Sequence, residues 1–243
     1  MLNKWIPILL LGLLASCQPK LPESPLPSPD IWKVKISGSL SWLEPAINTC
    51  TLAQPGKGII IIKEGEDLIA DMSLQWNTEI PAGGTIAEIG WDELSIVVHP
   101  DNPLQALSIE ELQSIFSGKI RSWEEVNQPG QGSGEIEAWV HPPEDEITKG
   151  FIDIFSFQPS RNPQNHVAPS PSTLRQAISS NPLAIGYLPA HWLDNSIRSI
   201  PIQGIPPENL RRPILGLFPK EPMGPTRIWL TCLQDAMSKS TPP

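Results

Sequence analysis

Leu107-Ser-Ile-Glu-Glu-Leu-Gln-Ser-Ile-Phe-Ser-Gly-Lys-Ile-Arg-Ser-Trp123 is the stretch of this sequence that decides its fold. Ser108 and Glu111 have the spacing of a capping box, in which a serine caps a helix and the glutamate three residues on reaches back to it. The apolar side chains that follow form one stripe: Leu112, Ile115 and Phe116. Gly118 then ends the helix. This stretch therefore predicts a short amphipathic helix with a defined start and stop.

Strand and helix patterns alternate on both sides of this helix. Apolar alternation and short apolar runs predict strands at 32–36, 58–62, 86–89, 94–99, 135–140, 184–188, 199–202 and 213–218. Helical spacing predicts helices at 40–52, 148–155, 172–179 and 226–237. We interpret 86–89 and 94–99 as a strand pair that turns at Gly90. The order of elements predicts an α/β fold with mixed strands.

The N-terminus has the order of a secretory signal. Lys4 precedes an apolar run over residues 6–14, which is shorter than the roughly 20 residues that span a bilayer. Leu14-Ala-Ser-Cys17 matches the lipobox of bacterial lipoproteins. We therefore expect a signal peptide over 1–16, lipidation of Cys17, and an extracytoplasmic protein anchored to the cell membrane, facing the periplasm or the outside. The alternative is an ordinary cleaved signal with a chance cysteine.

Residues 17–30 hold five prolines after the cysteine, which favours an extended, semi-rigid tether. The net charge of the whole chain is −9, and an acidic surface argues against nucleic acid as a partner. The four histidines are scattered without metal-ligand spacing, so we expect no metal and no cofactor. Cys50 and Cys232 either form a disulfide or remain two separate thiols.

Several stretches, taken in order, resemble the phosphate-binding proteins of bacterial ABC transporters. The segment 107–123 is close to a characteristic helix and turn of that family, and Val97-Val-His-Pro-Asp-Asn-Pro103 resembles its strand-to-crossover segment. Ala184-Ile-Gly-Tyr187 and Arg211-Arg-Pro-Ile-Leu215 are similar to two later strands. The resemblance covers about 34–235, almost the whole body that follows the tether.

This resemblance implies a two-lobed type II periplasmic-binding-protein fold with two crossover strands, near 98–103 and 187–190. Lobe 1 is then 31–98 plus 190–243, and lobe 2 is 99–189. The family binds its solute in the cleft between the lobes, where helix N-termini offer free N–H groups. The resemblance also implies that the ligand is a small solute, a class that includes oxyanions. It further implies an ABC permease as partner and a monomeric protein.

The resemblance also suggests ligand-binding residues in lobe 1. The turn Ser37-Gly38-Ser39 resembles the family's first ligand loop, and its N–H groups and the hydroxyls of Ser39 and Ser41 suit an oxyanion; Ser39 is equally explained as a helix cap. Asp71 and Ser73 resemble a second ligand segment. For that segment, a strand-end role for Asp71 and an alignment on Asp67 stay open.

The lobe 2 part of the site departs from the family pattern. Relatives that bind phosphate carry an arginine followed by Ser-Gly-Thr, whereas this chain has His141-Pro-Pro-Glu-Asp-Glu-Ile-Thr148. His141, Glu144 and Thr148 are the ligand-binding candidates here. Acidic residues 144–146 would fill or repel the position of an anion. Tight phosphate binding is then expected only if Arg121, Lys149 or Arg175 enters the site from elsewhere.

Three functions follow from these patterns. The first is a solute-binding lipoprotein of the phosphate-type ABC transporter family whose phosphate site is altered or lost. The second is a degenerate binding fold that serves as a sensory or surface interaction module without a small ligand. The third is a hydrolase built on His141 with Glu144 or Asp145. Because no stretch resembles a nucleophile elbow, we do not expect an enzyme.

Overall fold

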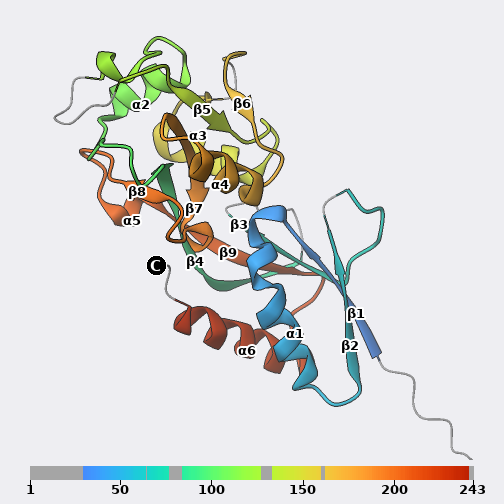
Figure 1. Cartoon of the computed structure of the whole chain (residues 1–243). Helices are drawn as coiled ribbons and strands as arrows, with labels where there is room; N and C mark the ends of the chain where they lie inside the picture. Colours follow the sequence, from blue (N-terminus) through green and yellow to red (C-terminus); the bar gives the residue numbers. More distant parts are fainter. Residues whose placement is uncertain (1–29, 64, 77–83, 127–132, 160–161, 241–243) are drawn as a thin grey trace, which may run out of the picture.

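The computed structural model describes residues 30–63, 65–76, 84–126, 133–159 and 162–240. The predicted signal peptide, Cys17 and nearly all of the tether lie outside these residues. Within them, the chain forms a nine-stranded mixed sheet in the order β2-β1-β3-β9-β4-β7-β5-β6, with β8 paired to β4. Helices pack against this sheet (Figure 1), so the α/β class is confirmed.

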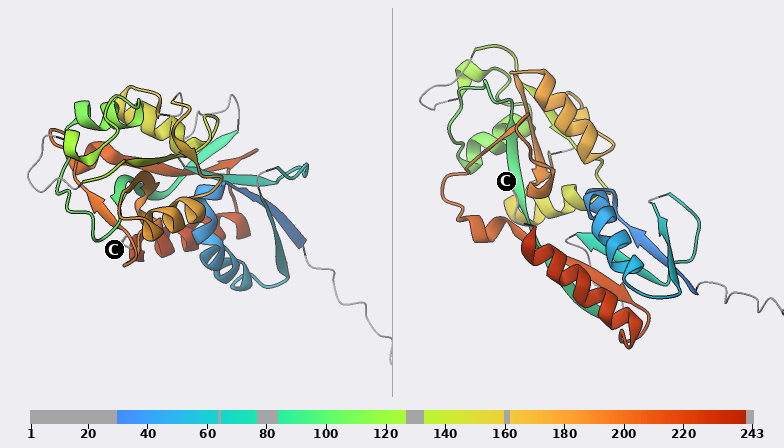
Figure 2. Two further views of the ribbon diagram at one scale, coloured as in Figure 1. Left: turned by 45° about the horizontal axis from the view of Figure 1, so that its top comes forward. Right: turned by 60° about the horizontal axis from the view of Figure 1, so that its bottom comes forward.

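The lower part of Figure 1 contains four neighbouring strands of the sheet, β2, β1, β3 and β9, and the first part of β4. β1 lies parallel to β2 and β3, whereas β9 runs antiparallel to β3 and β4. The elements of this part are β1 (Asp30–Ile36), η1 (Gly38–Leu43), α1 (Glu44–Leu52), β2 (Lys57–Ile62), β3 (Met72–Trp76), β9 (Arg211–Phe218) and α6 (Pro225–Lys239). α1 and α6 lie side by side, as both views in Figure 2 show.

The strand β4 spans Thr85–Val98, and the upper part is built on its second part. Leu94–Val98 of β4 pairs with β7, and β7 pairs in turn with β5. The elements of this part are α2 (Ile109–Phe116), η2 (Trp123–Glu125), β5 (Glu137–Val140), α3 (Glu146–Phe155), β6 (His166–Val167), α4 (Pro171–Ser180), β7 (Ala184–Pro189), η4 (Ala190–Trp192), β8 (Arg198–Ile200) and α5 (Pro207–Leu210). The lobe boundaries at 98 and 190 stay predictions; strand pairing changes partner between Glu93 and Leu94.

β4 is one continuous strand, so the expected strand pair with a turn at Gly90 is wrong. Gly90 marks a register shift against β9 and not a reversal of the chain. A Cβ at this position would lie 2.9 Å from the methyl carbon of Met237 on α6. The glycine is therefore explained by the close approach of α6 to the strand, which the sequence pattern alone does not distinguish from a turn.

Two helix starts show what local signals can determine. The capping box at Ser108 is confirmed: the Ser108 hydroxyl accepts from Glu111 N at 3.2 Å, and the Glu111 carboxylate accepts from Ser108 N at 2.9 Å. The helix expected over 40–52 instead begins as a 3₁₀ turn, η1, and becomes α-helical at Glu44. Pro45 stands in the first turn of α1, where a missing N–H costs nothing.

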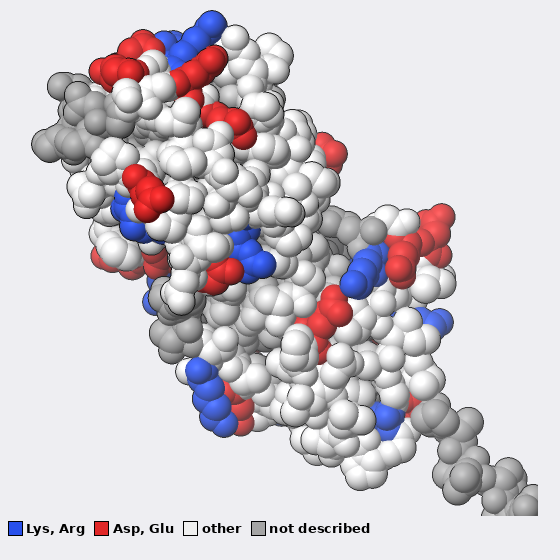
Figure 3. All heavy atoms as spheres, in the orientation of Figure 1, with Lys and Arg blue, Asp and Glu red and all other residues white. Residues whose placement is uncertain are grey.

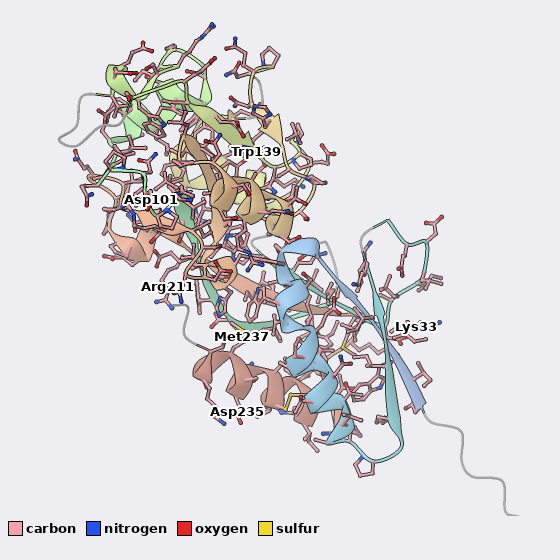
Figure 4. The ribbon with its side chains drawn as sticks, viewed as in Figure 1. Lys33, Asp101, Trp139, Arg211, Asp235 and Met237 are labelled. Carbon is pink, nitrogen blue, oxygen red and sulfur yellow. A yellow bond between two sulfur atoms is a disulfide. The ribbon has the colours of Figure 1, made fainter. Side chains whose placement is uncertain are left out.

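A disulfide joins α1 to α6 in the lower part, through Cys50 and Cys232 (Figure 4). Nearby, the indole N–H of Trp229 donates to the buried Thr51 hydroxyl at 3.1 Å. The two cysteines are 182 residues apart, so the bond closes almost the whole described chain into one loop. Among the described helices, none has both the length and the apolar character needed to cross a bilayer.

Replacing both Cys50 and Cys232 with serine should lower the free energy of unfolding by about 2–5 kcal/mol, because the open chain gains entropy when unfolded. Urea denaturation with and without a reductant measures this. Thr231→Ser, on the exposed side of α6, is the matched control and should leave stability unchanged. Equal stability of the wild type in both conditions would contradict a disulfide between these residues.

Candidate functional site

The candidate site lies at the carboxyl ends of two parallel strands. Ser37-Gly38-Ser39 follows β1, and Trp76 ends β3. Ile36 is in register with Leu74, and Ser37 N donates to Leu74 O at 3.3 Å. These two strand ends therefore share one edge of the sheet, which is where open α/β sheets bind ligands.

A carboxylate from the other part of the molecule occupies this edge. Glu146 is the first residue of α3, whose N-cap Asp145 accepts from Ile147 N at 2.7 Å. The Ser39 hydroxyl donates to Glu146 Oε1, and Trp76 N donates to Glu146 Oε2 at 2.9 Å. Ser37 also hydrogen-bonds this carboxylate, and its Oγ lies 3.1 Å from Ser39 Oγ. We call the hydroxyls of Ser37 and Ser39 and the N–H of Trp76 the cradle.

The enclosure of this carboxylate changes its acidity. Burial raises the pKa of Glu146 from 4.5 to about 7, although the hydrogen bonds from Ser37, Ser39 and Trp76 N oppose the shift. The negative charge of Asp145 adds to the rise. This rise in pKa corresponds to about 3 kcal/mol against the charged form, so desolvation outweighs the three donors. Glu146 in the cradle therefore loses its proton less readily than a carboxyl group in water.

The segment η4 contacts the cradle loop and holds it in place. The indole N–H of Trp192 donates to Ser39 O at 2.7 Å. The imidazole of His191 stacks on Trp42 of η1, with ring centroids 3.9 Å apart and planes at 7°. His191 Nδ1 also lies 3.0 Å from Asp92 Oδ1, and both side chains are buried. The cradle loop is thus fixed to η4, which follows β7, and η4 in turn contacts Asp92 of β4, the strand that runs through both parts of the molecule.

The predicted residues of the first ligand loop are partly brought together. Ser37 and Ser39 form the cradle, with Gly38 between them. Ser41 is half-buried within η1, and its hydroxyl makes no hydrogen bond in the described part of the chain. The N-cap of η1 is Ser37 and not Ser39, and the Ser39 hydroxyl bonds the Glu146 carboxylate.

Asp71 and Ser73 lie toward the opposite end of β3. The exposed Asp71 accepts from Lys33 N at 2.8 Å, beside the start of the strand. Trp76 is five residues further along, about 16 Å away at the usual strand rise. Figure 4 shows the labelled Lys33 near the outer side of the lower part. The strand-end interpretation of Asp71 therefore fits this structure, and neither Asp71 nor Ser73 reaches the cradle.

The lobe 2 candidates are distributed differently from the expectation. His141 and Thr148 are buried: Thr148 Oγ1 donates to His141 O at 3.2 Å and lies 3.1 Å from Tyr187 OH. Burial lowers the pKa of His141 to about 4, so its ring is neutral at physiological pH. Glu144 is exposed. We therefore replace these three residues by Glu146 in the candidate site.

Sequence reasoning missed two members of the site. Trp76 contributes its backbone N–H, which has no signature in the sequence, and Trp192 acts through Ser39 O. Glu146 was visible as one of three consecutive acids, but nothing in the sequence distinguished it from Glu144. Within the described part of the chain, no group of three or more His, Cys, Asp or Glu residues suits a metal ion.

The three cations that would restore an anion site make no bond to the cradle among the residues that the structure describes, although the charge of Lys149 partly offsets the burial that raises the pKa of Asp145 at the start of α3. Arg121 Nε donates to Gly118 O at 3.0 Å, and Arg175 pairs with Asp194 at 3.2 Å. Lys149 is exposed on α3. None of these three bonds a cradle residue, so the cradle consists of neutral donors.

Comparison with known proteins agrees with this architecture. Residues 84–204 match the family model described as PBP superfamily domain. The chain is 25% identical over 160 residues to the phosphate-binding protein PstS of Bacillus subtilis (strain 168), an alignment covering 63% of this chain. It spans only about half of that relative, 51% of its length.

Two solved PBP structures share the fold. One is a phosphate ABC transporter substrate-binding protein with bound phosphate from Clostridium perfringens, with a TM-score of 0.71 and 18% identity over 84% of this chain and 93% of the other. The second is an ABC-type phosphate transport receptor from Vibrio cholerae, with a TM-score of 0.61 and 18% identity over 85% and 95%. The chain therefore has the mixed α/β fold of type II periplasmic binding proteins.

Replacing Glu146 with glutamine should stabilise the protein increasingly as the pH rises. The raised pKa favours protonated Glu146 in the folded state, so its contribution is complete below pH 4.5 and is lost as the pH rises through 7. Glutamine resembles the protonated form at every pH. The difference in unfolding free energy between variant and wild type should therefore grow by about 3 kcal/mol between pH 4.5 and above pH 7, measured by urea denaturation.

The comparison has to be a difference because His141 acts in the opposite direction. Its pKa is lowered from 6.5 to about 4, so it destabilises the fold as the pH falls through this window in both proteins. Glu144→Gln, at the exposed neighbouring acid, is the control, and its effect on the unfolding free energy should be smaller than that of Glu146→Gln at high pH. A pH-independent difference for Glu146→Gln would mean that its carboxylate does not lie in the cradle in solution.

Proposed function

We propose that this chain is an extracytoplasmic solute-binding lipoprotein, the binding component of a phosphate-type ABC transporter system whose phosphate site is altered. The PBP superfamily match and the name of the Bacillus subtilis relative support the binding role. The lipobox at Cys17 and the proline-rich tether support a membrane anchor. In this proposal an ABC permease is the partner, the protein is monomeric, and it has no catalytic activity.

The lobes of this proposal are 31–98 plus 190–243 and 99–189. The cradle then belongs to lobe 1 and Glu146 to lobe 2, so their contact crosses the cleft. Leu94–Val98 and β8 pair with each other beside β7, which suggests that the change between lobes falls near Glu93. With lobes divided at 98 and 190 the connecting segments are β4 and the end of β7, whereas in the division by strand pairing they are β4 and the junction of α5 with β9.

The observation that carries the proposal is the position of the Glu146 carboxylate. It occupies the donors that a bound oxyanion would need, and no Lys or Arg bonds the cradle in the described residues. A phosphate dianion would meet a second negative charge without a compensating cation, which is unfavourable by several kcal/mol at low effective dielectric. Lys, Arg, Asp and Glu are also scattered over the face in Figure 3, without a large basic patch there. The site is therefore retained in position but changed in charge.

A second function is favoured by the same contact. Because the cradle is already filled by a side chain of the protein, the chain is complete without a small ligand. The protein would then act as a sensory or surface interaction module with Glu146 bound in the cradle. A screen of oxyanions, amino acids, polyamines and sugars by thermal shift separates the two: stabilisation by any class supports solute binding, and none supports the module.

Micromolar inorganic phosphate should leave the melting temperature of residues 30–243 unchanged, because Glu146 occupies the cradle. Thermal shift and titration calorimetry measure this, with Ser39→Ala as the site control. A shift of several degrees that Ser39→Ala abolishes would show that phosphate displaces Glu146 and that the site is not altered.

Replacing Cys17 with alanine should move the full-length protein from the membrane fraction to the soluble fraction, because stable anchoring depends on its acyl chains. Fractionation followed by immunoblotting measures the distribution. Ser16→Ala, which keeps a small residue before the cysteine, is the control and should stay with the membrane. A Cys17→Ala protein that still sediments with membranes would contradict the lipid anchor.

A further inference from the structure

The cradle shows which chemical group it accepts. Its donors use both oxygens of the Glu146 carboxylate: Ser39 bonds Oε1, and Trp76 N bonds Oε2. The indole of Trp192 fixes the Ser39 carbonyl and so holds the loop in this form. An arrangement of two hydroxyls and one N–H around a flat, two-oxygen anion is a carboxylate site made of neutral donors.

The opposite wall of the same contact is acidic. Glu146 and its neighbour Asp145 begin α3, and Asp145 is engaged as the helix cap. Since Glu146 extends from α3 while the cradle extends from β1 and β3, any separation of these elements withdraws the carboxylate and frees the cradle at the same time. Such a separation would open a cleft at this contact, with the donors of the cradle on one side and the Glu146 carboxylate on the other.

We propose that this cleft binds a small zwitterion, whose carboxylate replaces that of Glu146 in the cradle and whose ammonium group pairs with the displaced Glu146. The inference rests on the proposed function, because it assigns a solute to the same site. The exchange breaks no covalent bond: one carboxylate leaves the cradle and another enters it. The ligand class is a free amino acid or a similar molecule with both charges.

Single-charge ligands fit this cleft less well. A simple carboxylate can fill the cradle but leaves its charge facing that of Glu146. A simple amine can pair with Glu146 but leaves the hydroxyls and the N–H of the cradle without an acceptor, which is costly for buried donors. A zwitterion satisfies both walls, and it also adds no net charge to a chain whose charge is −9.

The test uses titration calorimetry on residues 30–243 with six probes: glycine, β-alanine, γ-aminobutyrate, acetate, ethylamine and inorganic phosphate. The three amino acids differ in the distance between their charges. At least one of them should bind the wild type about 10-fold or more tightly than acetate, ethylamine or phosphate.

Variants assign the two walls. Glu146→Gln should weaken amino-acid binding by about 10- to 100-fold and strengthen acetate binding, because the charge that repels a carboxylate is gone. Ser39→Ala should weaken both ligands, and Glu144→Gln should change neither. Glu146→Asp keeps the charge and should retain the preference for the zwitterion, with an altered preference for chain length. Melting curves establish that each variant is folded.

The outcomes separate this inference from the function on which it rests. If another solute from the wider screen binds the wild type while amino acids bind no better than acetate, the zwitterion assignment is wrong and the solute-binding function stands. If amino acids bind but Glu146→Gln has no effect, the assignment to this cleft is wrong. If no solute of any class binds the wild type or Glu146→Gln, both the inference and the proposed function are overturned.

Discussion

One half-buried carboxylate connects the two parts of this molecule, and much of the site depends on it. Glu146 reaches from the start of α3 to the ends of β1 and β3, where it accepts from Ser39 and from Trp76 N. Three donors do not fully compensate the loss of water, so the pKa of Glu146 rises to about 7. The stability of this contact therefore depends on two opposing effects, the cost of desolvating the carboxylate and the gain from its hydrogen bonds. A competing solute changes the hydrogen bonds, and a change of pH changes the charge of the carboxylate.

The scaffold explains why such a contact forms at this place. The parallel pairing of β1 with β3 brings the carboxyl ends of two strands to one edge, and the loop after β1 is held there by Trp192. The chain crosses between the parts in β4 and again where α5 joins β9, and His191, just after β7, contacts both Asp92 of β4 and Trp42 of η1. A movement of α3 relative to the cradle would therefore have to alter the contacts of Trp192 and His191 with the cradle loop and β4.

The relation to phosphate-binding proteins concerns the position of the site more than its chemistry. The fold is shared with phosphate-binding proteins. In the proposed function the difference lies in the lobe 2 wall, where this chain places the Glu146 carboxylate against the cradle. Under the proposal, neutral donors opposite a carboxylate favour a ligand that carries both charges over a simple anion. The same scaffold can change its ligand class in this way through one short segment, because the helix start at 145–146 faces the cradle directly.

The sequence alone determined what depends on neighbouring residues. The capping box at Ser108, the strand alternation around β1 and the serine loop at 37–39 are local patterns, and the structure contains each of them. It also indicated that acids near 144–146 disfavour phosphate. Only the tertiary structure decided that Glu146 and not Glu144 enters the cradle, that His141 and Thr148 are core residues, and that Gly90 permits α6 to approach β4 without a turn. These are contacts between distant segments, and the residue that makes such a contact depends on the orientation of whole helices and strands, which a local pattern does not contain.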